Sequence, residues 1–184
     1  MSVIEIAAAS LGVVTVLLVV RRSMWNFPVA LAMVSLYFVV FLDAKLYSDA
    51  LLQIFFFVIN LYGWWNWHRA PTDDDGVAVE AMDWPARLRW GGATAAVSLA
   101  LGFAMARWTD AAAPFPDAAV AGMSIAAQLL QSLRRVESWL WWIAVDLLAV
   151  GLYASRGLTV TAALYVVFLG IAVAGLVAWR RHLA

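Results

Sequence analysis

The sequence predicts an all-α integral membrane protein with seven transmembrane helices. Of its 184 residues, 65% are hydrophobic and only 13% are charged, and the mean hydropathy is +0.85. Because surface-to-volume scaling limits the core of a soluble domain, a soluble protein of this length cannot bury so much apolar surface. The apolar runs are long and continuous, whereas strands of a membrane barrel alternate apolar and polar residues. Helices are therefore predicted throughout.

Seven segments are long enough to be membrane spans, since roughly 20 mostly apolar residues cross about 30 Å of hydrocarbon. They are residues 3–20, 25–42, 46–67, 88–106, 117–133, 139–154 and 158–179. The longest hydrophilic stretch, residues 68–87, separates the third span from the fourth and carries the acidic run Asp73-Asp74-Asp75. We expect a solvated loop there.

The basic residues predict the orientation of the chain. Nine of the twelve Lys and Arg residues fall at one end of the spans and three at the other. Cytoplasmic ends are rich in Lys and Arg, so the N-terminus is predicted outside and the C-terminus in the cytoplasm. The nine are Arg21, Arg22, Arg69, Arg87, Arg89, Arg134, Arg135, Arg180 and Arg181; the three are Lys45, Arg107 and Arg156.

Composition and motifs also exclude several functions. The net charge of zero gives no reason to expect a nucleic-acid partner. The lack of cysteine excludes disulfides, thiolate metal sites and cysteine catalysis. No P-loop pattern is present, and no nucleophile lies beside a base in the sequence. An enzyme, a cofactor and a bound metal are therefore not predicted.

The first and last parts of the chain resemble each other, which predicts an internal repeat. Shifting the sequence by 113 positions places Arg21-Arg22 on Arg134-Arg135. A shift of 112 positions places Leu46, Gly63, Trp67 and Arg69 on Leu158, Gly175, Trp179 and Arg181. Because one span separates the two three-span units, both units have the same orientation, which is a parallel repeat. Transporters built this way bind their substrate near the midplane, between the units.

The predicted organisation follows from this repeat. Residues 1–67 form a first three-helix bundle, and residues 68–87 form a cytoplasmic loop. Residues 88–116 form a connector helix and loop, and residues 117–184 form a second three-helix bundle.

Polar residues within the spans are the candidate substrate-binding residues, because a polar group inside the membrane is costly unless it faces a cavity or a partner helix. Gln53 and Asn60 are seven residues apart and share one face of the third span. Trp139, Trp142 and Asp146 form a stripe on the sixth span. The remaining candidates are Phe57, Trp64 and Trp67 beside the Gln53 face, and Tyr165, which the repeat places where Gln53 stands.

These residues suit a flat, cationic solute with hydroxyl groups. Trp faces attract cations, a carboxylate at Asp146 complements the charge, and the amides of Gln53 and Asn60 bind hydroxyl or amide groups. An alternative interpretation places Trp67 and Trp139 in an aromatic belt at the membrane interface. On that alternative the amides join neighbouring helices, and Asp146 pairs with a neighbouring side chain.

Two segments resemble motifs of the PnuC family of vitamin transporters. Residues 53–67, QIFFFVINLYGWWNW, resemble the third core helix of that family. Residues 137–146, ESWLWWIAVD, resemble its sixth-helix Trp motif. With the seven-span layout, the resemblance covers essentially the whole chain. It implies a fold similar to that of the SWEET sugar transporters, a homotrimer, and pocket or gate roles for Gln53, Asn60, Trp67, Trp139, Trp142 and Asp146.

The resemblance implies facilitated uptake of a vitamin by alternating access, followed by trapping through a cytosolic kinase. The expected substrate is nicotinamide riboside, carried across the inner membrane of a bacterium. Thiamine and riboflavin, which relatives carry, are the alternatives, because some nicotinamide riboside carriers have an amide where Asp146 stands and another near Ala174. Two other classes stay open: a substrate-binding subunit that needs an ATPase partner, and a purely structural membrane subunit.

Overall fold

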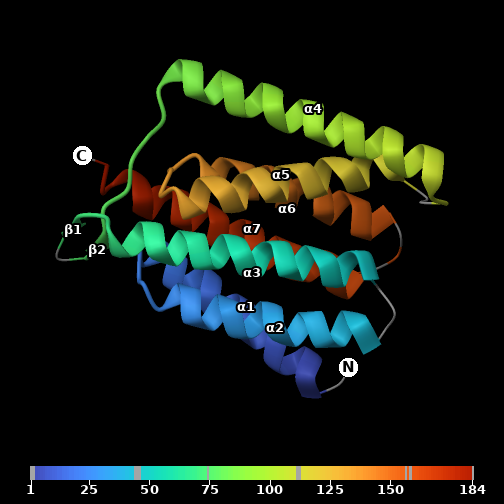
Figure 1. The fold of residues 1–184 in the computed structure, drawn as a ribbon, viewed down its shortest axis with the longest axis horizontal. Helices are drawn as coiled ribbons and strands as arrows, with labels where there is room; N and C mark the ends of the chain where they lie inside the picture. Colours follow the sequence, from blue (N-terminus) through green and yellow to red (C-terminus); the bar gives the residue numbers. More distant parts are fainter. Residues whose placement is uncertain are drawn as a thin grey trace.

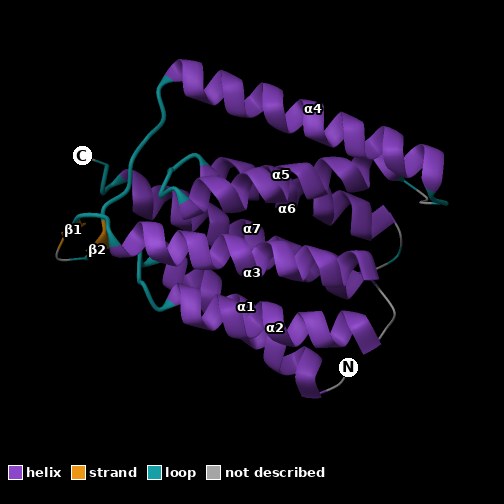
Figure 2. Ribbon diagram, in the orientation of Figure 1, coloured by secondary structure: helices purple, strands orange, loops and turns teal. Residues whose placement is uncertain are grey.

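The computed structural model describes residues 3–43, 47–73, 75–110, 113–155, 157 and 159–183. Within these residues the chain forms seven helices that run alongside one another, and one small hairpin (Figures 1 and 2). The helices are α1 (Val3–Val20), α2 (Asn26–Asp43), α3 (Tyr47–His68), α4 (Trp84–Trp108), α5 (Pro114–Ser132), α6 (Ser138–Ser155) and α7 (Thr159–Arg180). Strands β1 (Thr72–Asp73) and β2 (Gly76–Val77) pair antiparallel in the loop after α3. The predicted all-α class is confirmed.

Each predicted span corresponds to one helix, and their ends differ by at most four residues. The largest difference is at α4, which begins at Trp84 inside the predicted loop. The Asp83 carboxylate accepts a hydrogen bond from the Ala86 amide (2.8 Å), and Pro85 occupies the first turn. A side-chain cap and an early proline are both strong helix-start features, and they outweigh the polarity of the segment.

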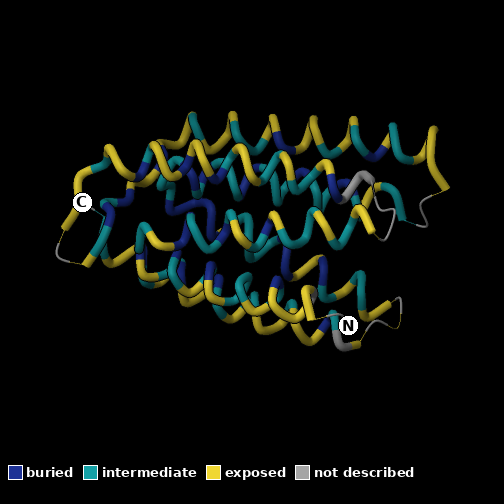
Figure 3. Tube along the Cα trace, turned by 60° about the horizontal axis from the view of Figure 1, so that its bottom comes forward, coloured by how far each residue is buried: buried dark blue, intermediate teal, exposed yellow. Residues whose placement is uncertain are grey.

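Length and hydropathy alone mark only some of these helices as membrane spans. In the described part of the chain three helices meet both criteria, at Asn26–Asp43, Ser138–Ser155 and Thr161–Arg180, and Ile6–Val20 is apolar but shorter. Large apolar side chains nevertheless cover the outer surface, whose exposed segments are seen in Figure 3. Leu51, Phe103 and Val167 are each more than half exposed. Such a surface suits hydrocarbon rather than water.

The helices form two groups of three. Helices α1, α2 and α3 pack in sequence and are called the first unit; α5, α6 and α7 do the same and are called the second unit. The units meet where α3 packs on α5 and where α1 packs on α7. Helix α4 packs on α5 along the outside of the bundle, and the N- and C-termini lie at opposite ends of it (Figure 1).

The two units repeat the same contacts with an offset of 112 positions. The Trp67 indole donates a hydrogen bond to the Gln131 carbonyl (3.1 Å), and the Trp179 indole donates one to the Val19 carbonyl (3.0 Å). Trp179 follows Trp67 by 112 positions, and Gln131 follows Val19 by the same interval. The glycines at the corresponding positions 63 and 175 each lie against an aromatic ring. Each unit therefore binds an indole of the other in the same way.

The turn after the first helix of each unit shows independently that the two units are offset by 112 positions. Arg22 and Arg134 both adopt the left-handed backbone conformation, with φ of 52° and 59°, which is uncommon for residues other than glycine. The two residues are 112 positions apart, so the shift of 113 predicted from the arginine pairs is wrong by one. A shift of 113 aligns both arginines of each pair and a shift of 112 aligns only one, so these pairs favour the wrong register and the backbone conformation corrects it. Of the other residues used in the predictions, Lys45, Leu46, Asp74, Arg156 and Leu158 lie outside the described residues.

Candidate functional site

A cavity of about 250 Å³ lies between the two units. It is bounded by α1 and α2 on one side and by α5, α6 and α7 on the other. The first unit contributes Gly12, Thr15, Val16, Val19 and Met33; the second contributes Ser124, Gln128, Gln131, Trp139, Trp142, Val145, Asp146, Tyr165, Phe168 and Ala172.

The walls of the cavity are equivalent in position but different in chemistry. Helices α1 and α5 present residues that are 112 positions apart, pairing Gly12 with Ser124, Val16 with Gln128, and Val19 with Gln131. In each pair the α1 residue is apolar and the α5 residue is polar. Thr15 also lines the α1 side, but its hydroxyl donates to the Leu11 carbonyl (2.8 Å) of its own helix. A bound molecule would therefore meet a mostly apolar wall on one side and hydrogen-bonding groups on the other.

The carboxylate of Asp146 lies in the polar wall. Asp146 is 4% exposed and stands on α6, one turn beyond Trp142. Among the described residues none donates a hydrogen bond to it or forms an ion pair with it. A buried carboxylate is costly unless a partner of opposite charge or a donor meets it. A positively charged or hydrogen-bond-donating group in the cavity would supply the missing partner.

Aromatic side chains complete the same wall. Trp139 and Trp142 line the cavity on α6, and Tyr165 and Phe168 line it on α7. The Tyr165 ring stacks on Tyr153, with centroids 5.3 Å apart. A flat ring can bind against these faces, and a cation gains further attraction over the face of a Trp ring.

Two glutamines of α5 are cavity residues that the sequence reasoning did not single out. The Trp142 indole donates to Gln131 Oε1 (2.8 Å), and Gln128 Nε2 donates to Asn60 Oδ1 (3.3 Å). Their three-residue spacing places both on one face of the fifth span, and this is the signal in the sequence that indicates them. The two amides are held in fixed orientations by these bonds.

The predicted residues of α3 lie elsewhere. Asn60 is buried behind the cavity wall, where it also donates to the Phe56 carbonyl (2.8 Å). Gln53, Phe57 and Trp64 do not line the cavity, and Trp64 belongs to a shallow hollow on the outer surface with Leu61, Trp65 and His68. Helix α3 packs on α2 and α5 just as its counterpart α7 packs on α6 and α1, but it is α7 that contributes residues to the cavity.

Four buried aromatic residues, called the aromatic plug, pack together at one end of the cavity. They are Phe27, Trp67, Trp139 and Trp179, each at most 3% exposed. Trp67 packs edge-on against Phe27 (5.1 Å) and Trp179 packs edge-on against Trp139 (5.6 Å), and the two pairs meet where Trp67 approaches Trp179 (5.9 Å). Because Trp139 also lines the cavity, the plug packs directly against one end of it.

The loop between α3 and α4 covers the outer side of this plug. Its described residues, 70–73 and 75–83, are called the strap, and its Val77 and Val79 pack in the same core as the plug. On the first unit, Arg22 is 2% exposed and binds both carboxylate oxygens of Asp73 (2.7 and 3.0 Å). The hydrogen bonds from Arg22 hold the pKa of Asp73 down to about 2. The strap is therefore fastened to the first unit by a charged pair.

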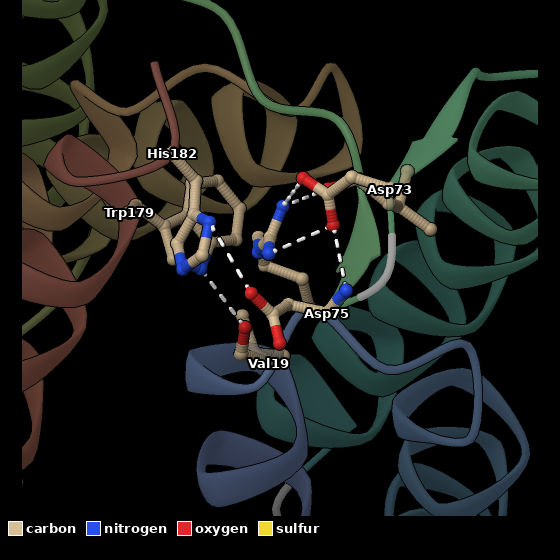
Figure 4. Close-up of polar contacts among 7 residues, drawn as sticks. Val19, Asp73, Asp75, Trp179 and His182 are labelled. Atoms are coloured by element: carbon tan, nitrogen blue, oxygen red, sulfur yellow. Dashed lines mark hydrogen bonds and ion pairs between the residues drawn. The ribbon is translucent and has the colours of Figure 1, made fainter.

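Main-chain bonds fasten both units to the strap. The amide of Val77 donates to the Arg22 carbonyl (3.2 Å), and the amide of Glu80 donates to the Arg134 carbonyl (3.0 Å). At the C-terminus, the Trp179 indole is directed at the Val19 carbonyl, and His182 lies 3.9 Å from Asp75 (Figure 4). The strap thus joins equivalent turns of the two units.

A buried carboxylate strengthens the attachment to the second unit. Glu137 is 4% exposed, accepts a hydrogen bond from the Met82 amide (3.0 Å), and forms an ion pair with Arg87 (2.8 Å). Hydrogen bonds to a charged group are stronger than neutral ones. This end of the strap is therefore firmly fixed beside the start of α4.

A cavity enclosed between two repeated three-helix units, inside an apolar outer surface, defines a helical membrane transporter. Residues 2–181 match the family described as Nicotinamide mononucleotide transporter, and the chain belongs to that family. The predicted membership of the PnuC family of vitamin transporters is thereby confirmed.

Individual relatives agree with this assignment. The chain is 26% identical over 204 residues to the Nicotinamide riboside transporter PnuC of Escherichia coli (strain K12), covering 97% of this chain and 85% of that one. It is 30% identical over 173 residues to the Riboflavin/roseoflavin transporter RibM of Streptomyces davaonensis, covering 92% and 80%. A crystal structure of the Vitamin B3 transporter PnuC superposes with a TM-score of 0.77 at 25% identity, covering 96% of this chain and 81% of that one.

Proposed function

We propose that this protein carries nicotinamide riboside into the cell and binds it in the cavity between the units. The observation that carries the proposal is the buried Asp146 carboxylate, which has no donor or cation beside it among the described residues and shares its wall with Trp139 and Trp142. Nicotinamide riboside is a flat pyridinium cation with a carboxamide and a ribose. The cation complements Asp146 and the Trp faces, and the amides of α5 match its hydroxyl and carboxamide groups.

The three candidate vitamins can be ranked by how well they fit the size and charge of the cavity. At about 250 Å³ it is slightly below the roughly 300 Å³ at which small-molecule sites usually begin, so it favours a small substrate. Thiamine is also a small cation with a hydroxyl group, so it fits the same chemistry. Riboflavin has three fused rings and no positive charge, and it leaves Asp146 without a partner. The similarity to RibM is what keeps riboflavin as the second candidate.

Transport is proposed to occur by alternating access of the two units, without an energy source in the chain. The aromatic plug packs at the end of the cavity nearest the strap, where a gate would be needed. All nine arginines assigned to the cytoplasm lie at that end, and Arg107 lies at the other. We infer that the strap is cytoplasmic and the N-terminus outside, in a bacterial inner membrane. A cytosolic kinase would trap the vitamin, and the chain would assemble as a trimer.

Uptake into liposomes tests the proposed function. Purified protein in vesicles without ATP is expected to equilibrate radiolabelled nicotinamide riboside across the membrane. Competition by unlabelled nicotinamide riboside, thiamine or riboflavin then ranks the three vitamins as substrates. Uptake without ATP would exclude a subunit that needs an ATPase. Failure to bind any vitamin of the panel, by calorimetry and thermal shift, would refute the proposal and favour a structural subunit.

A matched pair of variants tests the site itself. Asp146→Asn is expected to weaken binding about tenfold or more, because a charge-assisted interaction contributes roughly 1.5–3 kcal/mol. Asp43→Asn, at the exposed end of α2, is the control and should bind as the wild type does. Equal affinity of the two variants would show that the cation does not bind at Asp146.

A further inference from the structure

We propose that Gln131 is a positioning residue that fixes the ring of Trp142 and thereby sets the preference of the cavity for flat cations. The inference rests on the proposed function. Gln131 lies in the last turn of α5 and Trp142 in the second turn of α6, and both line the cavity.

The contact between the two side chains is direct. The Trp142 indole N–H donates to Gln131 Oε1 at 2.8 Å, and no other acceptor for this N–H is found among the described residues. A partly buried indole N–H needs an acceptor, so the amide determines which orientation of the ring is stable. The ring face presented to the cavity therefore depends on Gln131.

The backbone of Gln131 is itself fixed. Its carbonyl accepts hydrogen bonds from the Trp67 indole (3.1 Å) and from the Arg134 amide (3.0 Å). Carbonyls in the last turn of a helix lack partners within the helix, and these two donors satisfy this one. The glutamine side chain thus starts from an anchored point, which makes its oxygen a well-placed acceptor.

The internal repeat shows that the scaffold does not require this side chain. The position of Gln131 in the first unit is taken by Val19, whose carbonyl accepts from Trp179 just as that of Gln131 accepts from Trp67. The position of Trp142 is taken by Ala30. A valine and an alanine therefore suffice to build this corner of a unit. The pair of amide and indole is an addition of the second unit, on the wall that carries Asp146.

Orientation matters because the attraction between a cation and an indole acts over the ring face. A ring free to turn presents its edge for part of the time, and the cation then loses that attraction. Losing one hydrogen bond of this kind corresponds to about a five- to tenfold change in an equilibrium constant. Gln131→Leu, which keeps the size but removes the acceptor, is expected to weaken binding of nicotinamide riboside by that factor.

A double-mutant cycle separates positioning from direct contact with the substrate. Trp142→Phe keeps an aromatic ring but has no N–H, so Gln131→Leu should cost less than about twofold more in that background. The matched control is Gln128→Leu, which removes a cavity amide that bonds Asn60 instead of Trp142. Its effect should be the same in both backgrounds. A full Gln131→Leu effect in the Trp142→Phe background would overturn the proposal, as would no effect in the wild type.

A measurement without substrate keeps the proposal testable if the proposed function fails. The indole N–H resonance of Trp142, identified by its loss in Trp142→Phe, is expected to shift and to exchange faster with water in Gln131→Leu. In Gln131→Glu, which retains an acceptor oxygen, it should stay protected. An unchanged resonance in Gln131→Leu would refute the positioning role. Failure of the wild type to bind any vitamin of the panel would refute only the proposed function.

Discussion

Substituting Gly175 by alanine tests the packing of the aromatic plug. A Cβ atom at this position would lie 2.6 Å from three atoms of the Trp139 ring. That ring is 1% exposed and packs against Trp179, so it cannot turn away without displacing its neighbours. Overpacking of this kind costs about 1–3 kcal/mol, and the gain from replacing a helical glycine offsets only about 0.5–1 kcal/mol of it.

The net effect is worked out against a glycine of the same helix. A Cβ atom added at Gly170 would meet nothing within 4 Å, so Gly170→Ala should be neutral or slightly stabilising. Gly175→Ala should cost about 1 kcal/mol after this offset, which lowers Tm by about 2–4 °C for a chain of this size. Thermal unfolding of both variants in detergent measures the difference. Equal Tm values would refute the packing argument.

The repeat adds a second comparison. Gly63→Ala would bring its Cβ to 2.7 Å from the Phe27 ring, so it should destabilise the first unit in the same way. Phe27 does not line the cavity, whereas Trp139 does. Substrate binding should therefore weaken in Gly175→Ala and remain within about twofold of wild type in Gly63→Ala, once both are folded. Calorimetry on the folded fractions distinguishes the two.

Three further predictions concern the strap and the outer face of α3. Glu137→Gln should destabilise the protein by about 2 kcal/mol, because it removes a charged acceptor from a buried site; the exposed Glu80→Gln should change Tm little. Since Arg22 depresses the pKa of Asp73 from 3.8 to about 2, its contribution is fully present above about pH 4 and is lost as the pH falls towards 2. Asp73→Asn should remove that acid dependence of Tm, and an unchanged dependence would count against the pair. Gln53→Ala should leave vitamin binding within about twofold of wild type, and a larger loss would place substrate on α3.

The fold follows from the sequence because the run lengths of apolar residues set the number of helices. The start of α4 could not be predicted from hydropathy, since it depends on the cap at Asp83 and the proline after it. The equivalence of Arg22 with Arg134 also required the structure, because in the sequence the arginine pairs align fully only at a shift of 113. The start of a helix and the register of a repeated turn depend on local backbone geometry, which composition does not show.

The cavity could be predicted in part. Trp142 and Asp146 stand out as a polar and aromatic stripe on an apolar helix, and the structure places both in the cavity wall. Periodicity shows that Gln53 and Asn60 share a face of α3, but it does not show which neighbour that face meets. The repeat suggests that α3 and α7 are equivalent, yet in the described part of the chain α7 borders the cavity and α3 does not. The two units therefore differ in which helix borders the cavity, although the sequence repeat makes α3 and α7 equivalent.

The attachment of the strap limits how far the two units can separate at its end of the molecule. The amide of Val77 is bonded to the first unit and that of Glu80 to the second. Three residues of fully extended chain reach about 11 Å at roughly 3.6 Å each. The two hydrogen bonds add 3.2 and 3.0 Å. While both hold, the Arg22 and Arg134 carbonyl oxygens can therefore lie at most about 17 Å apart, however the helices tilt. The strap therefore limits the separation of the two units at this end of the molecule. A wider separation requires the loss of the main-chain hydrogen bond at Val77 or at Glu80.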